Sequence, residues 1–289
     1  MSSQKHQEII FVTGKGGVGK SAVAAAVAMK RARAGKKTLL AELGYQSFFK
    51  DYFSLPSVGY QPTNLEKNLD VALWSGPECL KEYALYLLKV ESLYKLFFEN
   101  AVTKALVNVA PALSELAILG KITSHPRKVG PPLNYDCLVV DAFATGHFLA
   151  LLRAPKGMSE AIKFGPMGDQ SRSIEKVLSN PEICKFMVVS LPEEMPVIEG
   201  LELADGIEKL VGQKPLHVYN RIVQMPSDIA QVTDLSDNLK KFQAHMKHIQ
   251  DQQDQLRKKL QTHPPMCEMP YVFSANPFEI VSQLSEVAP

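Results

Sequence analysis

The fold is decided by residues 8–28, which read EIIFVTGKGGVGKSAVAAAVA. The run at 8–13 places isoleucine, phenylalanine and valine in succession, which predicts a strand buried on both faces. A glycine-rich loop follows, and the small residues from Lys20 onward predict a helix over 20–34. The glycines let backbone N–H groups turn inward, and the helix N-terminus adds partial positive charge. The stretch therefore predicts a phosphate-binding loop.

Residues 14–21, GKGGVGKS, match the Walker A pattern of a glycine, four residues and Gly-Lys-Ser. We predict that Lys20 neutralises charge on the β- and γ-phosphates and that the Ser21 hydroxyl coordinates Mg²⁺. The predicted cofactors are therefore ATP or ADP and Mg²⁺. The residues predicted to bind the nucleotide in this loop are Gly14, Lys15, Gly16, Gly17, Val18, Gly19, Lys20, Ser21 and Ala22.

Strand-like and helical stretches alternate along the rest of the chain. This alternation predicts a single α/β domain over 1–289, a doubly wound P-loop NTPase fold with a mainly parallel sheet. Further strands are predicted at 37–42, 69–74, 135–141, 185–191, 216–223 and 269–273. Further helices are predicted over most of 77–124, from 145–152 onward, and at 171–179, 197–211 and 235–261.

Two regions depart from this alternation. Residues 76–130 lie between two predicted strands where a crossover needs only one helix, so they predict an inserted helical subdomain. Its apolar content fits either a lid packed on the domain or a groove for a hydrophobic protein client. Residues 235–261 repeat apolar side chains at steps of three and four, which predicts a long helix. That helix either packs on its own sheet or forms a coiled-coil arm.

Composition excludes several classes of protein. The 289 residues are 46% hydrophobic, and 32 Lys and Arg against 30 Asp and Glu give a net charge of +2, so no nucleic-acid partner is predicted. No apolar run reaches the roughly 18 residues of a membrane span, and the first residues lack a signal-peptide core. We therefore expect a soluble cytoplasmic protein without a stable membrane anchor. The four cysteines are far apart, which argues against disulfides and a zinc site.

A second phosphate-site element is predicted at 135–141, YDCLVVD. An apolar strand that delivers Asp141 at its C-terminal end fits the Walker B pattern, in which the carboxylate holds Mg²⁺ through water. The segment that follows, 142–155, reads AFATGHFLALLRAP.

These motifs resemble the ArsA-like and tail-anchored-protein-targeting branch of deviant Walker A, SIMIBI-type ATPases, in a single-half bacterial form. The likeness rests on the second lysine of the loop, Lys15, and on Thr-Gly-His four residues after Asp141. It extends to LPEEMP at 191–196 and to VYNRI at 218–222, in the same order along the chain. The thiols of arsenite pumps and the zinc-binding Cys-x-x-Cys of targeting factors are missing.

The resemblance implies a dimeric switch that hydrolyses ATP to ADP and phosphate and moves its helical subdomain with nucleotide state. The dimer is a homodimer or a heterodimer with a related ATPase. In such families the equivalent of Lys15 reaches the nucleotide of the other subunit; otherwise Lys15 simply faces solvent. The resemblance also assigns Asn220 to the adenine edge, since an amide offers a donor and an acceptor, and places Arg221 beside it.

The pattern fails at two places. Phe143 and Ala144 replace the Ala-Pro of the family, and Gly44 stands where the family carries the switch I aspartate that positions water. We therefore predict slow hydrolysis, with Lys15, Lys20, Glu42 and Asp141 as the catalytic set. Glu42 organises Mg²⁺ and water, or it is an idle carboxylate at a strand end.

Two other functions compete with this one. The first is a nucleotide-gated binding module with little or no hydrolysis that pairs with a related ATPase. The second is a MinD-like ATPase that grips a membrane or filament, which the short acidic segment 282–289 disfavours because it lacks a basic face.

Overall fold

The computed structural model describes residues 7–88, 111–224, 236–259 and 267–289. In these ranges one sheet has the strand order β3-β4-β2-β5-β1-β6-β7-β8, and only the β3–β4 pair is antiparallel. This arrangement confirms the predicted α/β fold with a mainly parallel sheet. The strands are β1 Glu8–Gly14, β2 Thr38–Leu43, β3 Thr63–Glu66, β4 Leu69–Trp74, β5 Cys137–Ala144, β6 Cys184–Ser190, β7 Leu216–Ile222 and β8 Cys267–Pro270.

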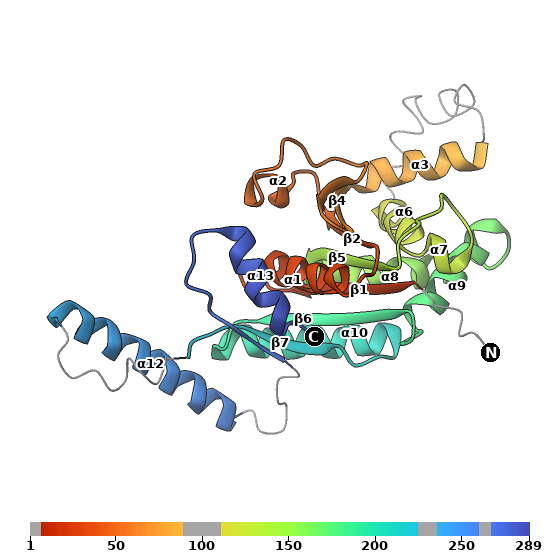
Figure 1. Cartoon of the computed structure of the whole chain (residues 1–289). Helices are drawn as coiled ribbons and strands as arrows, with labels where there is room; N and C mark the ends of the chain where they lie inside the picture. Colours follow the sequence, from red (N-terminus) through yellow and green to blue (C-terminus); the bar gives the residue numbers. More distant parts are fainter. Residues whose placement is uncertain (1–6, 89–110, 225–235, 260–266) are drawn as a thin grey trace, which may run out of the picture.

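Helices cover both faces of the sheet (Figure 1). Side chains of β1 alternate between two buried clusters: Ile9 and Phe11 pack with α6, α8 and α10, whereas Ile10 and Val12 pack with α1 and α13. A strand buried on both faces needs apolar residues at every position, which explains the unbroken apolar run. The helices are α1 Lys20–Arg33, α2 Phe48–Tyr52, α3 Gly76–Leu88, α6 Pro111–Ile122, α7 Ser124–Arg127, α8 Thr145–Ala161, α9 Pro166–Leu178, α10 Glu194–Val211, α12 Asp237–Lys259 and α13 Pro277–Val287.

Several elements differ from the prediction. The short α2 and the edge strand β3 are absent from it, because neither is long enough to show a hydrophobic period. Helix α13, which includes most of the acidic segment 282–289, is also absent from the prediction. Its start signal is Asn276, whose side chain accepts hydrogen bonds from two backbone N–H groups, followed by Pro277 at the first helical position. The predicted strand at 269–273 is also shifted, since β8 ends at Pro270 and Phe273 is exposed.

Helices α3, α6 and α7 lie between β4 and β5, inside the predicted insertion at 76–130. Its middle part, 89–110, lies outside the described residues. The buried Lys121 of α6 forms an ion pair of 2.7 Å with Glu82 of α3, and its ammonium lies over the rings of Tyr60 and Trp74. This contact ties the helical region to the edge of the sheet.

The long helix α12 contacts the sheet through its C-terminal half. Leu256 packs with Tyr219 and Ile222 of β7, and the buried Gln253 accepts a hydrogen bond from the backbone N–H of Val223 at 3.1 Å. Near the other end, the side chain of Phe242 is half exposed, and the helix projects from the domain (Figure 1). Both ends of the predicted range 235–261 lie outside the described residues. No helix in the described ranges combines the length and the apolar character that crossing a bilayer requires.

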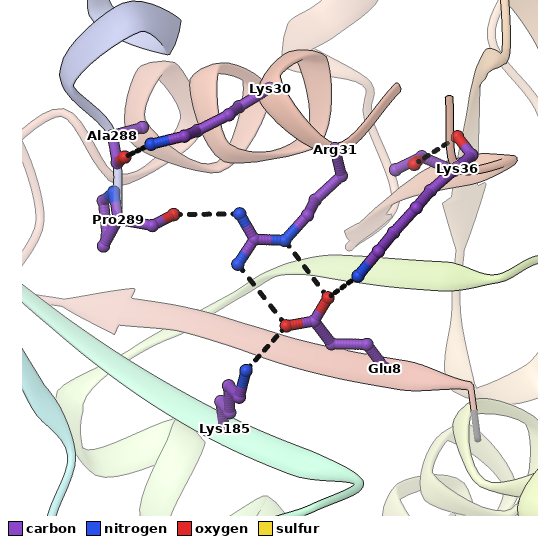
Figure 2. Close-up of polar contacts among 8 residues, drawn as sticks. Glu8, Lys30, Arg31, Lys36, Lys185, Ala288 and Pro289 are labelled. Atoms are coloured by element: carbon purple, nitrogen blue, oxygen red, sulfur yellow. Dashed lines mark hydrogen bonds and ion pairs between the residues drawn. The ribbon is translucent and has the colours of Figure 1, made fainter. Parts of the chain in front are cut away.

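At the N-terminal end of β1, the buried Glu8 gathers three cations (Figure 2). Its carboxylate accepts from Lys36 at 2.7 Å, from Lys185 at 2.8 Å and from Arg31 Nε at 3.1 Å. Arg31 also donates to the carbonyl of Pro289 at 3.1 Å, so the cluster joins α1, β1, β6 and the segment after α13. Burial alone raises the pKa of Glu8, but the hydrogen bonds from these cations outweigh it and hold the pKa at about 2.

We expect Glu8→Gln to lower the free energy of unfolding by about 2 kcal/mol at pH 7, because three cations lose their shared counterion. The pKa is about 2 in the folded protein against 4.5 as the model-compound value, so this contribution is complete above pH 4.5 and is lost as the pH falls through 2. Urea unfolding at pH 7 and pH 3 measures it, with the exposed Glu182→Gln as the matched control. Equal stability of the two variants at pH 7 would contradict the prediction.

Candidate functional site

The phosphate loop leaves the sheet at Gly14 and enters α1 at Lys20. A Cβ atom on Gly14 would lie 2.2 Å from the carbonyl oxygen of Val189, so only glycine fits there. Gly19 caps α1 with φ of 87°, and no side chain caps the helix. The first turn of α1 also lacks acidic residues, so its N–H groups point toward the loop without a competing anion. This geometry fits the predicted phosphate site.

Lys20 is the phosphate-binding lysine of the prediction. Its ammonium donates to the carbonyl of Lys15 at 3.1 Å, across the loop. Burial lowers the pKa of Lys20, and the nearby charge of Asp141 partly restores it. The lysine therefore lies beside the carboxylate that is expected to organise the cation.

Asp141 lies on β5 between two neighbouring strands, in register with Val12 of β1 and Glu42 of β2. Burial and, to a smaller extent, the charge of Glu42 raise the pKa of Asp141, whereas a hydrogen bond from Ser21 and the charge of Lys20 lower it; the resulting pKa is about 6. Within the described part of the chain, the buried Oδ1 atom of Asp141 has no hydrogen-bond partner. A buried carboxylate with a free oxygen, next to a serine hydroxyl, fits a hydrated Mg²⁺, which usually takes few protein ligands and completes its shell with water and phosphate. In the described residues there is no group of three His, Cys, Asp or Glu side chains suited to a metal ion.

Glu42 is buried beside Asp141, but both of its oxygens already accept hydrogen bonds. Oε2 accepts from the Ser47 hydroxyl at 2.7 Å, and Oε1 accepts from the backbone N–H of Phe48 at 2.6 Å. Ser47 in turn caps α2. Burial raises the pKa of Glu42, although these hydrogen bonds oppose the increase. Glu42 is therefore not an idle strand-end carboxylate, because it holds the segment that contains Gly44 in place.

The segment after Asp141 is tied to the end of β1 by a hydrogen bond from a side chain to the backbone. The Thr13 hydroxyl donates to the carbonyl of Phe143 at 2.7 Å. The ring of Phe143, which departs from the family pattern, stacks on His147 with ring centres 4.0 Å apart. This stacking joins the end of β5 to the first turn of α8.

Lys15 pairs within its own chain. Its ammonium lies 2.7 Å from Oε1 of Glu199 on α10, with 48% of the lysine side chain exposed. Sequence analysis assigns no role to Glu199, although the residue stands three positions after the LPEEMP motif. The predicted role of Lys15 in another subunit stays a prediction.

Asn220 and Arg221 lie on β7 beside the same loop. Asn220 is buried, and its amide donates to the carbonyl of Val18 at 2.9 Å. A Cβ atom on Gly19 would lie 2.4 Å from the same amide, so Asn220 braces the loop. Arg221 has φ of 59°, rare for a residue with a side chain, and its charge lowers the pKa of Tyr52, which burial raises. Their roles toward adenine stay predictions.

The remaining loop residues have simple environments. Gly16 and Gly17 are exposed, Val18 is buried, and Ala22 packs partly against the α1 side of the core. The structure therefore brings the predicted loop, Asp141, Glu42, Asn220 and Arg221 to one edge of the sheet. The residues that sequence analysis missed, Ser47 and Glu199, are those that hold Glu42 and Lys15.

The chain is similar to several known ATPases. The family model ArsA_ATPase, described as anion-transporting ATPase, matches residues 7–167. The chain is 31% identical over 220 residues to "Putative arsenical pump-driving ATPase" of Halobacterium salinarum, covering 70% of this chain and 33% of that protein. It is 29% identical over 239 residues to "ATPase BagA" of Mycobacterium tuberculosis, covering 78% and 68%. It is 26% identical over 208 residues to "Arsenical pump-driving ATPase" of Escherichia coli, covering 70% and 32%. The chain thus spans about a third of the two pump-driving relatives. The tail-anchored-protein-targeting branch stays a prediction.

We expect Asp141→Asn to stabilise the fold when Mg²⁺ is absent. The pKa is about 6 in the folded protein against 3.8 as the model-compound value, so ionisation of Asp141 opposes folding at neutral pH and has no effect below pH 3.8. The expected gain is about 2 kcal/mol at pH 7.5 and none at pH 3.5. Urea unfolding with a chelator present measures it. The control is Asp136→Asn, an exposed carboxylate just before β5. A loss of stability at pH 7.5 would contradict the prediction.

Proposed function

This chain belongs to the ArsA ATPase family, and on that premise we propose that it is a slow ATPase whose nucleotide state controls its association with a second subunit. The observation that carries the proposal is the complete phosphate site, in which Lys20, Ser21, Asp141 and the uncapped start of α1 converge at one sheet edge. Nucleoside triphosphate with Mg²⁺ is the ligand that such a site fits best.

Each residue has a task in this proposal. The N–H groups of the loop and the Lys20 ammonium bind the phosphates, while Ser21 and Asp141 hold the cation. Mg²⁺, when bound, supplies positive charge against the phosphates. Glu42 positions the segment at 43–48, and Asn220 keeps the loop in its binding shape through Val18. Lys15 of one subunit adds positive charge beside the nucleotide of the other subunit as the phosphoryl group leaves.

The helical region supports the further proposal that a hydrophobic client binds there. A cavity of about 310 Å³ lies between α3, α6 and α9. Its walls are almost entirely apolar, and the exposed Met167 lies at its edge. An apolar cavity with few polar groups is the usual form of a site for an apolar ligand. Its lining includes Leu80, Tyr83, Leu116, Ala117, Met167 and Ile174.

Gly44 favours the second candidate, a nucleotide-gated binding module with little hydrolysis. It directly follows β2, and its backbone N–H donates to the carbonyl of Trp74 at 3.0 Å, so the position carries no carboxylate that could orient water. Glu42, the nearest acid in sequence, uses both oxygens for α2. Phosphate release in the presence of Mg²⁺ and ATP separates the two candidates. Turnover equal to that of Lys20→Ala would favour the binding module.

We expect Lys20→Ala to lower nucleotide affinity and phosphate release at least about 100-fold, because the lysine neutralises phosphate charge. Lys15→Ala is expected to keep nucleotide binding by the single chain and to lose association. Light scattering with Mg²⁺ and either ADP or a non-hydrolysable ATP analogue measures mass, and a fluorescent nucleotide measures affinity. Lys156→Ala, an exposed lysine on α8, is the control. A Lys15→Ala chain that associates as tightly as wild type would contradict the role of Lys15.

A further inference from the structure

We propose that Glu199 is a positioning residue that holds Lys15 against its own subunit and thereby sets how much ATP two chains need to associate. The inference rests on the proposed function, in which Lys15 acts on the nucleotide of another subunit. Beyond the proposed function, it assigns to a residue on α10 a part in controlling the association of two chains.

The contact joins two distant parts of the chain. Lys15 lies on the phosphate loop and Glu199 lies in the second turn of α10, and their charged atoms are 2.7 Å apart. An ammonium held by this carboxylate is directed toward its own α10. It has to leave Glu199 before it can reach a phosphate in another subunit.

The same pair is weak enough to open. The side chains of Lys15 and Glu199 are 48% and 30% exposed, so water screens their attraction. The phosphates of bound ATP carry more charge than one carboxylate and compete for the ammonium. Glu199 therefore shifts an equilibrium and does not block it.

A second acid lies beside the pair. Glu202, one helical turn after Glu199, lines the same cavity of about 260 Å³ together with Thr145 and Leu149. The Oε2 atom of Glu199 is buried without a hydrogen-bond partner among the described residues. Among the residues that the structure describes, only Glu199 contacts the Lys15 ammonium directly, so Glu202 serves as a control of equal charge on the same helix face.

Backbone contacts link this pair to phosphate binding. The carbonyl of Lys15 accepts the hydrogen bond of the Lys20 ammonium, while the side chain of Lys15 binds Glu199. A movement of Lys20 onto phosphate releases that carbonyl. The loop can then turn Lys15 away from α10, so both lysines change partners together.

The test compares Glu199→Gln with Glu202→Gln in the full chain. Association is followed by light scattering at increasing concentrations of a non-hydrolysable ATP analogue with Mg²⁺. We expect Glu199→Gln to associate at about two- to fivefold lower nucleotide concentration than wild type, the range that a half-exposed ion pair allows. Glu202→Gln should lower the nucleotide concentration needed for association by less than Glu199→Gln does. The difference between Glu199→Gln and wild type should shrink as NaCl is raised, because salt already weakens the pair.

Two further measurements exclude a merely structural effect. The melting temperature of Glu199→Gln should stay at the wild-type value. Fluorescent-nucleotide affinity, at chain concentrations too low for association, should also stay unchanged. An unchanged or higher nucleotide requirement for association overturns the inference alone. If neither wild type nor Glu199→Gln associates at saturating nucleotide, the proposed switch function fails and the inference fails with it. If Glu199→Gln associates at saturating nucleotide and wild type does not, the result supports both the proposed switch function and the inference about Glu199.

Discussion

The structure depends on the close approach of the phosphate loop to the strands on one side of β1. At Gly14 the backbone lies so near the carbonyl of Val189 on β6 that no Cβ fits, and at Gly19 the same is true of the Asn220 amide on β7. The sheet therefore determines the path of the loop at its first and last glycines. Between them the backbone N–H groups are free to face a ligand, since the start of α1 has no side-chain cap.

The two ends of β1 have opposite electrostatic character. At its start, Glu8 is surrounded by cations, and its charge is fully matched (Figure 2). Near its C-terminal end, Asp141 is buried next to Glu42 with one oxygen unpaired. The first arrangement stabilises the fold, whereas the second costs stability as long as Asp141 is ionised. A buried carboxylate that is kept ionised at the cost of local stability is typical of a functional site.

Two residues connect the site with more distant elements. Glu42 reaches from the sheet to the start of α2, and Lys15 reaches from the loop to α10. Under the proposed function, changes at the phosphates move the segment at 43–48 and release α10 without altering the sheet. The Lys15–Glu199 pair is partly exposed, so it is easier to exchange than the buried strand contacts.

The sequence alone predicts the phosphate loop, the buried parallel strands and the position of Asp141, because each is a local pattern of glycines or of apolar residues that ends in a charge. The hydrophobic period of the sequence does not predict α2 or β3, which are too short to show one, and it does not identify the start of α13. Three contacts are seen only in the tertiary structure: Asn220 braces Val18, Glu42 accepts from the N–H of Phe48 at the start of α2, and Lys15 binds Glu199. Asn220 and Val18 are 202 positions apart in the sequence, and Lys15 and Glu199 are 184 positions apart. Contacts of this kind are set by the order of the strands in the sheet, so the local spacing of residues does not predict them.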